Sequence, residues 1–593
     1  MKDSLHALGI ARSLFAIALA LTLAVGTTAV SLAAGPEHRG VWMHASYIKT
    51  PAEADRCVAL MERANFNAVY LLVWYWGGQA AFQSQLSPML EGVQPGYDPL
   101  GYMIQECHRR QIEVHAWFVN GYHGTDTPMR VLAEHPDWAV DYGDTPGRLW
   151  YDLAKPQVRK FQSDLMIETL TRYDLDGLHF DYIRYHDGYP AICYCKHCQT
   201  EFATRYGCGP FEKQSRKAYP FAGPMVGNPV SGPTTAQVLA RFSDGLPAIA
   251  TNELGKGKVL LFNWHALRSV ETPVAETWRR ALRQWNASPE NVVVMDTAPN
   301  RQHYGDKGTK EAAAALQRFG CKARIVAEDR LEKLPPGSVV VLSDVYLIPD
   351  AVAAALERFV REGGRLVVVD GPARSIHNAS IQRLLGMTRA SAWFTRFDLV
   401  EPVGTSELVP SDGTPIDLRQ HLAKLDKWAE YRKATVTELV SDVRRRARQV
   451  KPKAMITAAV FTPRASADRV YQDWPRWLRE GLVDYVLPMA YTPHNSQLAK
   501  QIQDWQAVAP RLDRIVPGLC LSQADSQDAY GYRDISLIFA QYRMCQEAGA
   551  RGVNFYALDN TDASPKLMLT EPLITALRTG PFADKVPARP QEK

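Results

Sequence analysis

An aspartate lies where a buried stretch of this chain turns polar. Residues 175 to 185 read Leu-Asp-Gly-Leu-His-Phe-Asp-Tyr-Ile-Arg-Tyr, and the apolar Leu178 and Phe180 predict a buried strand that ends at Asp181. In a parallel sheet covered by helices, residues at the carboxyl ends of the strands face the ligand. We therefore expect Asp181 to be a catalytic carboxylate. The alternative is an aspartate that pairs with Arg184 to close a loop.

Cysteines gather shortly after this segment, as Cys193-Tyr-Cys-Lys-His-Cys198 with a further cysteine ten residues on. Four thiolates, from Cys193, Cys195, Cys198 and Cys208, can hold a structural zinc ion in tetrahedral geometry. An oxidising compartment would favour disulfides instead. The chain has nine cysteines, so at least one stays unpaired within the chain or binds metal. Zinc and disulfides are both open, whereas a catalytic metal is not expected because four protein ligands leave no open position.

The elements that position Asp181 follow a repeating order of short apolar strand and helical stretch. The eight predicted strands cover residues 39–46, 68–74, 113–120, 175–185, 454–461, 483–491, 515–521 and 552–559. Eight strands alternating with helices predict an α/β protein with a TIM-type (β/α)8 barrel, formed by residues 35–208 and 427–580.

The alternation of barrel strands and helices is interrupted after the fourth strand, and residues 209–426 carry a second strand pattern. Valine-rich runs at 292–296, 323–327, 339–344 and 365–370 predict buried parallel strands separated by helices. Gly363 and Gly364 end one of these helices, as expected of a C-cap. The sequence therefore predicts an inserted, doubly wound α/β domain.

The two ends of the chain and its net charge limit the classes of function and the cellular location that we expect. Residues 1–34 resemble a secretory signal, with Lys2 and Arg12 before an apolar run and small residues near Ala34. An uncleaved anchor is the alternative; after cleavage we expect no stable membrane insertion and a secreted, periplasmic or extracellular protein. Residues 581–593 are expected to be a disordered tail. A net charge of +5 with one basic run, residues 444–448, argues against nucleic acid as a partner.

Four segments of the predicted barrel resemble the family-10-like glycosylhydrolases. They are Arg39-Gly-Val-Trp42, Val114-His-Ala-Trp-Phe118, the segment from Asp176 to Tyr185, and Val486-Leu-Pro-Met-Ala-Tyr491. The resemblance implies a secreted TIM-barrel enzyme that acts on glycosidic bonds in a polysaccharide or a cell-wall, peptidoglycan-type glycan. Asp181 is also similar in position to the nucleophile of several retaining glycosidase families.

The insert resembles the glutamine-amidotransferase-like, flavodoxin-type domains found inside some β-galactosidases. An active amidotransferase needs a cysteine on a strand-to-helix elbow, but the candidate turn reads Gly371-Pro-Ala-Arg374, and Cys321 precedes a strand. We therefore expect a non-catalytic domain, either a spacer or a contact that forms a homo-oligomer.

Glycoside hydrolysis usually needs a second carboxyl group beside the first. Asp559, at the end of the eighth predicted strand, is the expected acid; the alternative is a helix N-cap. Arg184 would keep Asp181 ionised. The other expected substrate-binding residues are aromatic platforms and hydrogen-bonding side chains at strand ends: Trp74, Trp76, His115, Trp117, Asn120 and Tyr491. A non-catalytic glycan-binding protein on the same scaffold is the alternative function.

Overall fold

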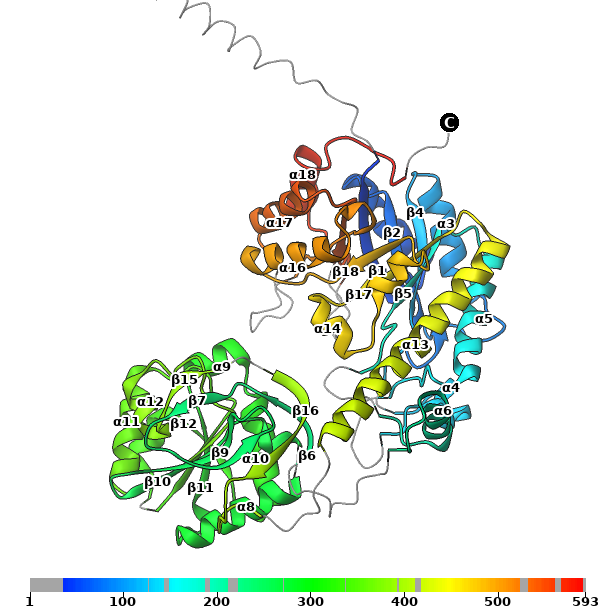
Figure 1. Ribbon diagram of the computed structural model, residues 1–593. Helices are drawn as coiled ribbons and strands as arrows, with labels where there is room; N and C mark the ends of the chain where they lie inside the picture. The colour runs from blue at the N-terminus through cyan, green and yellow to red at the C-terminus, as the bar shows by residue number, and fades with distance from the viewer. Residues whose placement is uncertain are drawn as a thin grey trace, which may run out of the picture.

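The computed structural model describes residues 36–125, 127–142, 149–186, 192–211, 222–269, 271–335, 337–391, 394–410, 418–522, 532–559 and 567–589. The predicted signal segment, residues 1–34, lies outside these ranges. Within them, no helix is both long enough and apolar enough to cross a bilayer. Figure 1 shows the remaining chain as two lobes, each built around its own sheet.

The first lobe is the predicted barrel. Its parallel strands are β1 (His38–His44), β2 (Ala68–Tyr75), β4 (Glu113–Val119), β5 (Gly177–Asp181), β17 (Met455–Val460), β18 (Tyr485–Pro488), β19 (Gly518–Cys520) and β20 (Gly552–Tyr556), with the short β3 (Gln79–Ala80) beside β2. They pair in the order β18-β17-β5-β4-β2-β1-β20-β19. Bridges from Val486 to Ile515 and from Met489 to Gly518 join the two ends of this order. All eight predicted strands are confirmed, and so is the closed barrel.

Helices cover the outside of this barrel. They are α2 (Pro51–Arg63), α3 (Pro99–His108), α4 (Val131–Glu134), α5 (Pro156–Arg172), α6 (Lys196–Tyr206), α13 (Leu418–Val450), α14 (Arg464–Arg469), α15 (Trp474–Arg479), α16 (Asn495–Val508), α17 (Ile535–Glu547) and α18 (Glu571–Thr579). Local sequence sets where they begin: at α2, Thr50 and Glu53 form a reciprocal capping box, and Pro51 occupies the first turn. Figure 1 shows the long α13 running beside α5.

Two apolar layers hold the barrel together. Alternate strand residues point outward and pack under the helices, as Val41, Val69 and Phe118 do. The residues between them point inward and fill the barrel with large side chains, among them Trp42 and Trp117. Because the side-chain period of a strand is two, this alternation separates the helix-facing core from the side chains that can reach the barrel mouth.

The second lobe is the inserted domain. Its sheet has the order β12 (Arg324–Ala327), β11 (Val292–Asp296), β13 (Val339–Ser343), β14 (Arg365–Val369), β10 (Gly257–Phe262), β9 (Pro247–Leu254), β8 (Gln237–Phe242), β16 (Phe394–Pro402) and β6 (Ala222–Gly227). A separate pair is β7 (Val230–Pro233) with β15 (Met387–Ala390). Its helices are α7 (Ala266–Ser269), α8 (Glu271–Gln284), α9 (Ala298–Tyr304), α10 (Lys307–Arg318), α11 (Asp350–Arg361) and α12 (Ala379–Leu385).

The inserted sheet is half parallel and half antiparallel. The first five strands of that order run parallel, and apolar clusters cover both faces of the sheet, as the doubly wound prediction requires. The last four pair in antiparallel fashion, and the sequence analysis did not predict them. Their more polar runs carry a weaker signal than the valine-rich parallel strands.

The segment after α18 packs against the barrel, which corrects the expectation of a disordered tail over residues 581–593. Phe582 is fully buried, with its ring 6.2 Å from that of Phe555. Arg589 pairs with Glu113 at 2.6 Å and with Asp176 at 2.9 Å. An apolar anchor and two ion pairs therefore fix residues 581–589, and the last four residues lie outside the described part of the chain.

Candidate active site

Asp181 is the last residue of β5 and lies at the carboxyl end of the barrel. Its side chain is almost fully buried, with 6% of the residue exposed. Trp117 donates its indole N–H to Oδ2 at 3.1 Å, and the backbone N–H of Tyr182 donates to Oδ1 at 2.6 Å. Both carboxylate oxygens therefore have a fixed direction in a site of low polarity.

Burial raises the pKa of Asp181 from 3.8 to about 6. The hydrogen bond from Tyr182, the charge of Arg184, the indole of Trp117 and the charge of His44 each lower the pKa, but they do not offset the desolvation of the carboxylate. Asp181 thus titrates near neutral pH and can hold a proton that an ordinary aspartate would have lost. A carboxyl group of this kind suits proton donation.

Asp559 follows β20 at the same end of the barrel and is paired with His44. Its Oδ1 lies 2.6 Å from Nδ1 of His44, and its Oδ2 accepts the backbone N–H of His44 at 2.8 Å. Both oxygens are occupied by His44, and the aspartate is buried. That Asp559 is the acid stays a prediction; the structure adds that both of its carboxylate oxygens contact His44.

His44 brings this pair up to Asp181. It is the last residue of β1, and its ring centroid lies 5.2 Å from that of Trp117, the residue that binds Asp181. His44 was not predicted, because only carboxylates at strand ends were considered as the catalytic partner of Asp181. The same criterion applied to histidines would have found it, since His44 lies inside the first predicted strand and close to its carboxyl end.

Aromatic side chains line the remainder of the barrel end. Tyr491 stacks on Tyr556 with ring centroids 5.0 Å apart, and its edge meets Trp42 at 6.4 Å. Burial raises the pKa of Tyr491, and the negative charge of Asp181 raises it further. The two side chains are therefore close enough to interact electrostatically. Trp76 packs half-buried against the same inner cluster. The structure thus gathers Trp76, Trp117 and Tyr491 of the predicted aromatic set near Asp181.

Arg184 also lies close to Asp181 but is held by aromatic rings. Its guanidinium carbon is 4.2 Å from the ring centroid of Phe461 and 4.5 Å from that of Tyr182. Its charge lowers the pKa of Asp181, as expected from the sequence, but less than burial raises that pKa. Arg184 therefore moderates the protonation of Asp181 without keeping it fully ionised at neutral pH.

Three predicted binding residues lie elsewhere, and the strand geometry explains each correction. Trp74 faces outward against Phe161 of α5, because a register shift between Leu72 and Trp74 interrupts the alternation of β2. Asn120 also faces α5, where its amide donates to Gln162 at 3.2 Å. A strand that points Trp117 inward must point residue 120 outward.

His115 faces the barrel interior but at its opposite end. It stacks on Tyr70 at 4.7 Å and pairs with Glu113 at 3.2 Å. It is aligned with Gly177, the first residue of β5, whereas Asp181 is the last. His115 and Trp117 share a face, as predicted, yet two residues of strand separate them by about 6.6 Å, so His115 lies too deep to contact a ligand beside Asp181.

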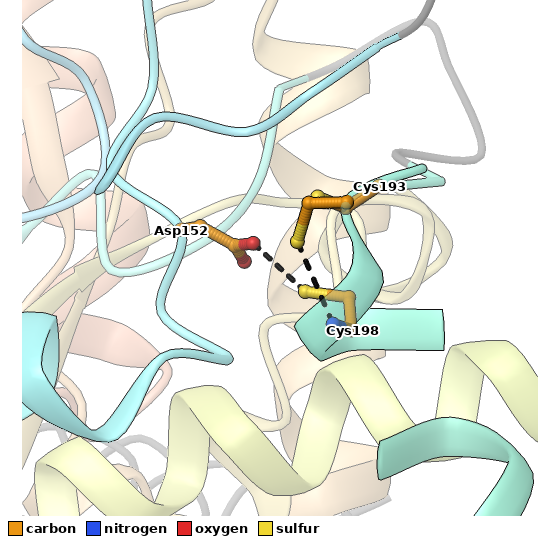
Figure 2. A group of neighbouring side chains, drawn as sticks. Asp152, Cys193 and Cys198 are labelled. Atoms are coloured by element: carbon orange, nitrogen blue, oxygen red, sulfur yellow. Dashed lines mark hydrogen bonds between the residues drawn. The ribbon is translucent and has the colours of Figure 1, made fainter. Parts of the chain in front are cut away.

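The predicted metal ligands come together only in part. Cys193, Cys195 and Cys198 lie around the start of α6, and Figure 2 shows Cys193 and Cys198 turned toward Asp152. Cys208 lies past the other end of α6, where its thiol contacts the carbonyl of Tyr206. An eleven-residue helix is about 16 Å long, so Cys208 cannot join this group. None of the nine cysteines, all of which fall in the described ranges, is in a disulfide.

The strand ends of the insert carry no cysteine in the part of the chain that the structure describes. Asp344 and Asp370 follow β13 and β14 with left-handed φ angles of 58° and 63°. Cys321 is buried before β12, where the indole of Trp278 donates to its sulfur at 3.1 Å. The backbone after β13 thus turns sharply, as an elbow does, but presents a carboxylate in place of a thiol.

Comparisons with known proteins find similarity in the barrel. The model of the family described as glycosyl hydrolase-like 10 matches residues 37–215 and 416–527, which include every strand of the barrel except β20 and leave out the insert. "Glycosyl hydrolase YngK" of Bacillus subtilis (strain 168) is 40% identical over 100 residues, 16% of this chain and 19% of that protein. "Glycosyl hydrolase DigH" of Escherichia coli (strain K12) is 32% identical over 142 residues, 20% of this chain and 31% of that protein.

The matches thus span less than a third of either curated relative. Among solved structures, the glycoside hydrolase domain of PgaB (BpsB) from Bordetella bronchiseptica aligns with a TM-score of 0.41 and 11% identity, over 94% of this chain and all of that one. The residues matched by the family model include His44, Asp181 and the cysteine group. The barrel of this chain thus resembles the glycosyl hydrolase-like 10 family.

Proposed function

We propose that this protein is a secreted glycoside hydrolase that cleaves O-glycosidic bonds in a polysaccharide or a cell-wall glycan. One observation carries the proposal: a buried carboxyl group that titrates near neutral pH, Asp181, lies beside an imidazole–carboxylate pair, His44 and Asp559, at the end of the barrel where ligands bind. The match of the barrel to a glycosyl hydrolase-like family model supports the same reaction class.

In this proposal Asp181 is the general acid. The protonated carboxyl group donates its proton to the glycosidic oxygen as the bond to the anomeric carbon breaks, so the leaving sugar departs as a neutral alcohol. The N–H groups of Trp117 and Tyr182 then stabilise the carboxylate that remains. Burial supplies the raised pKa that this role requires, and Arg184 limits the increase.

His44 and Asp559 supply the second function. Asp559 accepts a hydrogen bond from Nδ1 of His44, which leaves Nε2 of the neutral imidazole as the proton acceptor. An imidazole oriented in this way can take a proton from the water that attacks the anomeric carbon, and the buried Asp559 stabilises the imidazolium that forms. The pair therefore does the work of the second carboxylate in this reaction class.

The aromatic rings provide the sugar platform. Tyr491 and Tyr556 form a stacked pair beside Asp181, and flat faces of this kind pack against the apolar face of a pyranose ring. Such a platform would serve a glycan-binding protein equally well. The acid and the imidazole–carboxylate pair favour hydrolysis, because a binding protein has no need of a buried carboxyl group with a raised pKa.

Release of reducing ends tests this function. The mature protein and Asp181→Asn are incubated with a panel of polysaccharides that includes peptidoglycan glycan strands. Loss of cleavage in the variant, with glycan binding retained, supports the proposal. Binding of one glycan by both proteins with cleavage by neither would establish the binding protein, and equal cleavage by both would remove Asp181 from the chemistry.

A further inference from the structure

Four side chains outside the candidate active site lie close together, near the place where the chain passes from the barrel into the insert. Asp152 lies in the loop before α5, Cys193 before α6, Cys195 at the N-cap of α6 and Cys198 in its first turn. One ligand atom from each lies within 4.8 Å of the others. Figure 2 shows the carboxylate of Asp152 directed at the thiol of Cys198, which donates to Oδ2 at 2.9 Å.

Two buried cations lie beside this group of side chains. Arg432 lies 2.8 Å from Oδ1 of Asp152, and the ammonium group of Lys155 lies 3.9 Å from Oδ2. Arg432 is fully buried and Lys155 nearly so. Among the residues that the structure describes, these two cations lie beside the carboxylate of Asp152. Three thiolates, one carboxylate and a divalent cation would together carry a charge of −2, which the two cations neutralise.

Hydrogen bonds to sulfur also favour negatively charged sulfurs at this site. The backbone N–H of Asp141 points at the sulfur of Cys193 at 3.4 Å, and the backbone N–H of Cys198 points at that of Cys195 at 3.5 Å. Backbone donors around thiolate ligands stabilise their negative charge and fix their direction. The sulfurs of Cys193 and Cys195 thus accept backbone hydrogen bonds.

We propose that Asp152, Cys193, Cys195 and Cys198 bind one structural Zn²⁺ ion in tetrahedral geometry. Ligand atoms at zinc distances lie roughly 3.3–3.8 Å apart, which the observed grouping approaches. Three thiolates with one carboxylate match a borderline-soft ion, and a site with four protein ligands is closed to substrate. Binding displaces the thiol protons, including the one that Cys198 donates to Asp152.

The ion would tie together segments on both sides of the insert. Arg432 lies on α13, the helix by which the chain returns to the barrel, and α6 is the last helix before the chain leaves it. The hydroxyl of Tyr185 donates to Oδ1 of Asp152 at 3.3 Å, and Tyr185 lies in the segment that follows Asp181. This last link rests on the proposed function, since it connects the ion to the candidate acid, whereas binding of the metal does not depend on it.

Elemental analysis and X-ray absorption spectroscopy of the full-length purified protein test the proposal. We expect one zinc ion per chain with about three sulfur neighbours at roughly 2.3 Å and one oxygen at roughly 2.0 Å. Asp152→Cys should retain the ion and show four sulfur neighbours. Cys195→Ser should bind Zn²⁺ at least tenfold more weakly.

Cys208→Ser is the matched control, because it removes a nearby cysteine that the structure places outside the site; it should keep the full zinc content. Three results would overturn the proposal: no stoichiometric uptake of added Zn²⁺ by reduced wild-type protein, iron in place of zinc in the isolated protein, or a disulfide between two of the three cysteines in non-reducing peptide mapping. Loss of zinc in Cys208→Ser would overturn the ligand set. Because these readouts measure metal and not catalysis, they can fail independently of the hydrolase assignment.

Discussion

Replacing Asp181 by asparagine should stabilise the barrel at neutral pH while it abolishes the chemistry. Folding raises the pKa of Asp181 from 3.8 to about 6, so the ionised carboxylate is less stable in the folded protein than in the unfolded chain. A rise of this size corresponds to about 3 kcal/mol. The penalty is absent below pH 3.8, grows between pH 3.8 and 6, and is complete above pH 6.

The asparagine side chain has the shape of the protonated acid and never ionises, so it escapes this penalty. Its amide nitrogen must face one of the two N–H groups, from Trp117 or Tyr182, that now bind the two oxygens of Asp181. That mismatch removes part of the gain. We therefore expect a net stabilisation of about 2 kcal/mol at pH 7.5 and none at pH 4, or roughly 4–8 °C in the melting temperature of the barrel at the higher pH.

Differential scanning calorimetry at the two pH values measures this difference. Asp513→Asn is the control, because Asp513 is exposed on the same lobe and its substitution should leave the pH dependence unchanged. An equal effect of Asp181→Asn at both pH values, or a destabilisation at pH 7.5, would refute the argument that burial raises the pKa of this carboxyl group.

Three further predictions concern the same end of the barrel. His44→Ala should lower kcat by about 10²–10⁴-fold, because it removes the proton acceptor and leaves Asp559 buried without its partner; steady-state kinetics would refute this with a change below tenfold. Trp117→Phe removes a donor to the ionised form of Asp181, so the alkaline limb of the pH–rate profile should move upward; a downward shift would contradict it. Tyr491→Ala should weaken glycan binding by about tenfold, which titration calorimetry with an inactive variant measures, and unchanged affinity would remove Tyr491 from the platform.

The barrel could be predicted because period-two and helical patterns are local properties of the sequence. Each strand run, such as that from Val69 to Val73, is buried on both faces and reads as nearly continuous apolar residues. The polar network around Asp152 and the three cysteines could not be predicted in the same way. Asp152 lies 41 positions before Cys193, and only the folded loops bring them together.

The location of the candidate site could be predicted from the sequence, but the set of residues that form it could be predicted only in part. The strand-end criterion found Asp181 and Asp559, but sequence alone could not show that Asp559 binds an imidazole. Depth along a strand separates His115 from Trp117, and a shift in register turns Trp74 outward. Both depend on how neighbouring strands align, and the alignment of strands is set by contacts distant in sequence.

The pH dependence of kcat/KM for the wild-type protein, on the best glycan substrate of the panel, tests the central claim most directly. If Asp181 is the general acid, the rate falls as the pH rises through its pKa of about 6, and this limb is absent from the residual activity of Asp181→Asn. A rate that instead increases through pH 6 would show that the chemistry requires the ionised carboxylate, and would contradict the assignment of Asp181 as the proton donor.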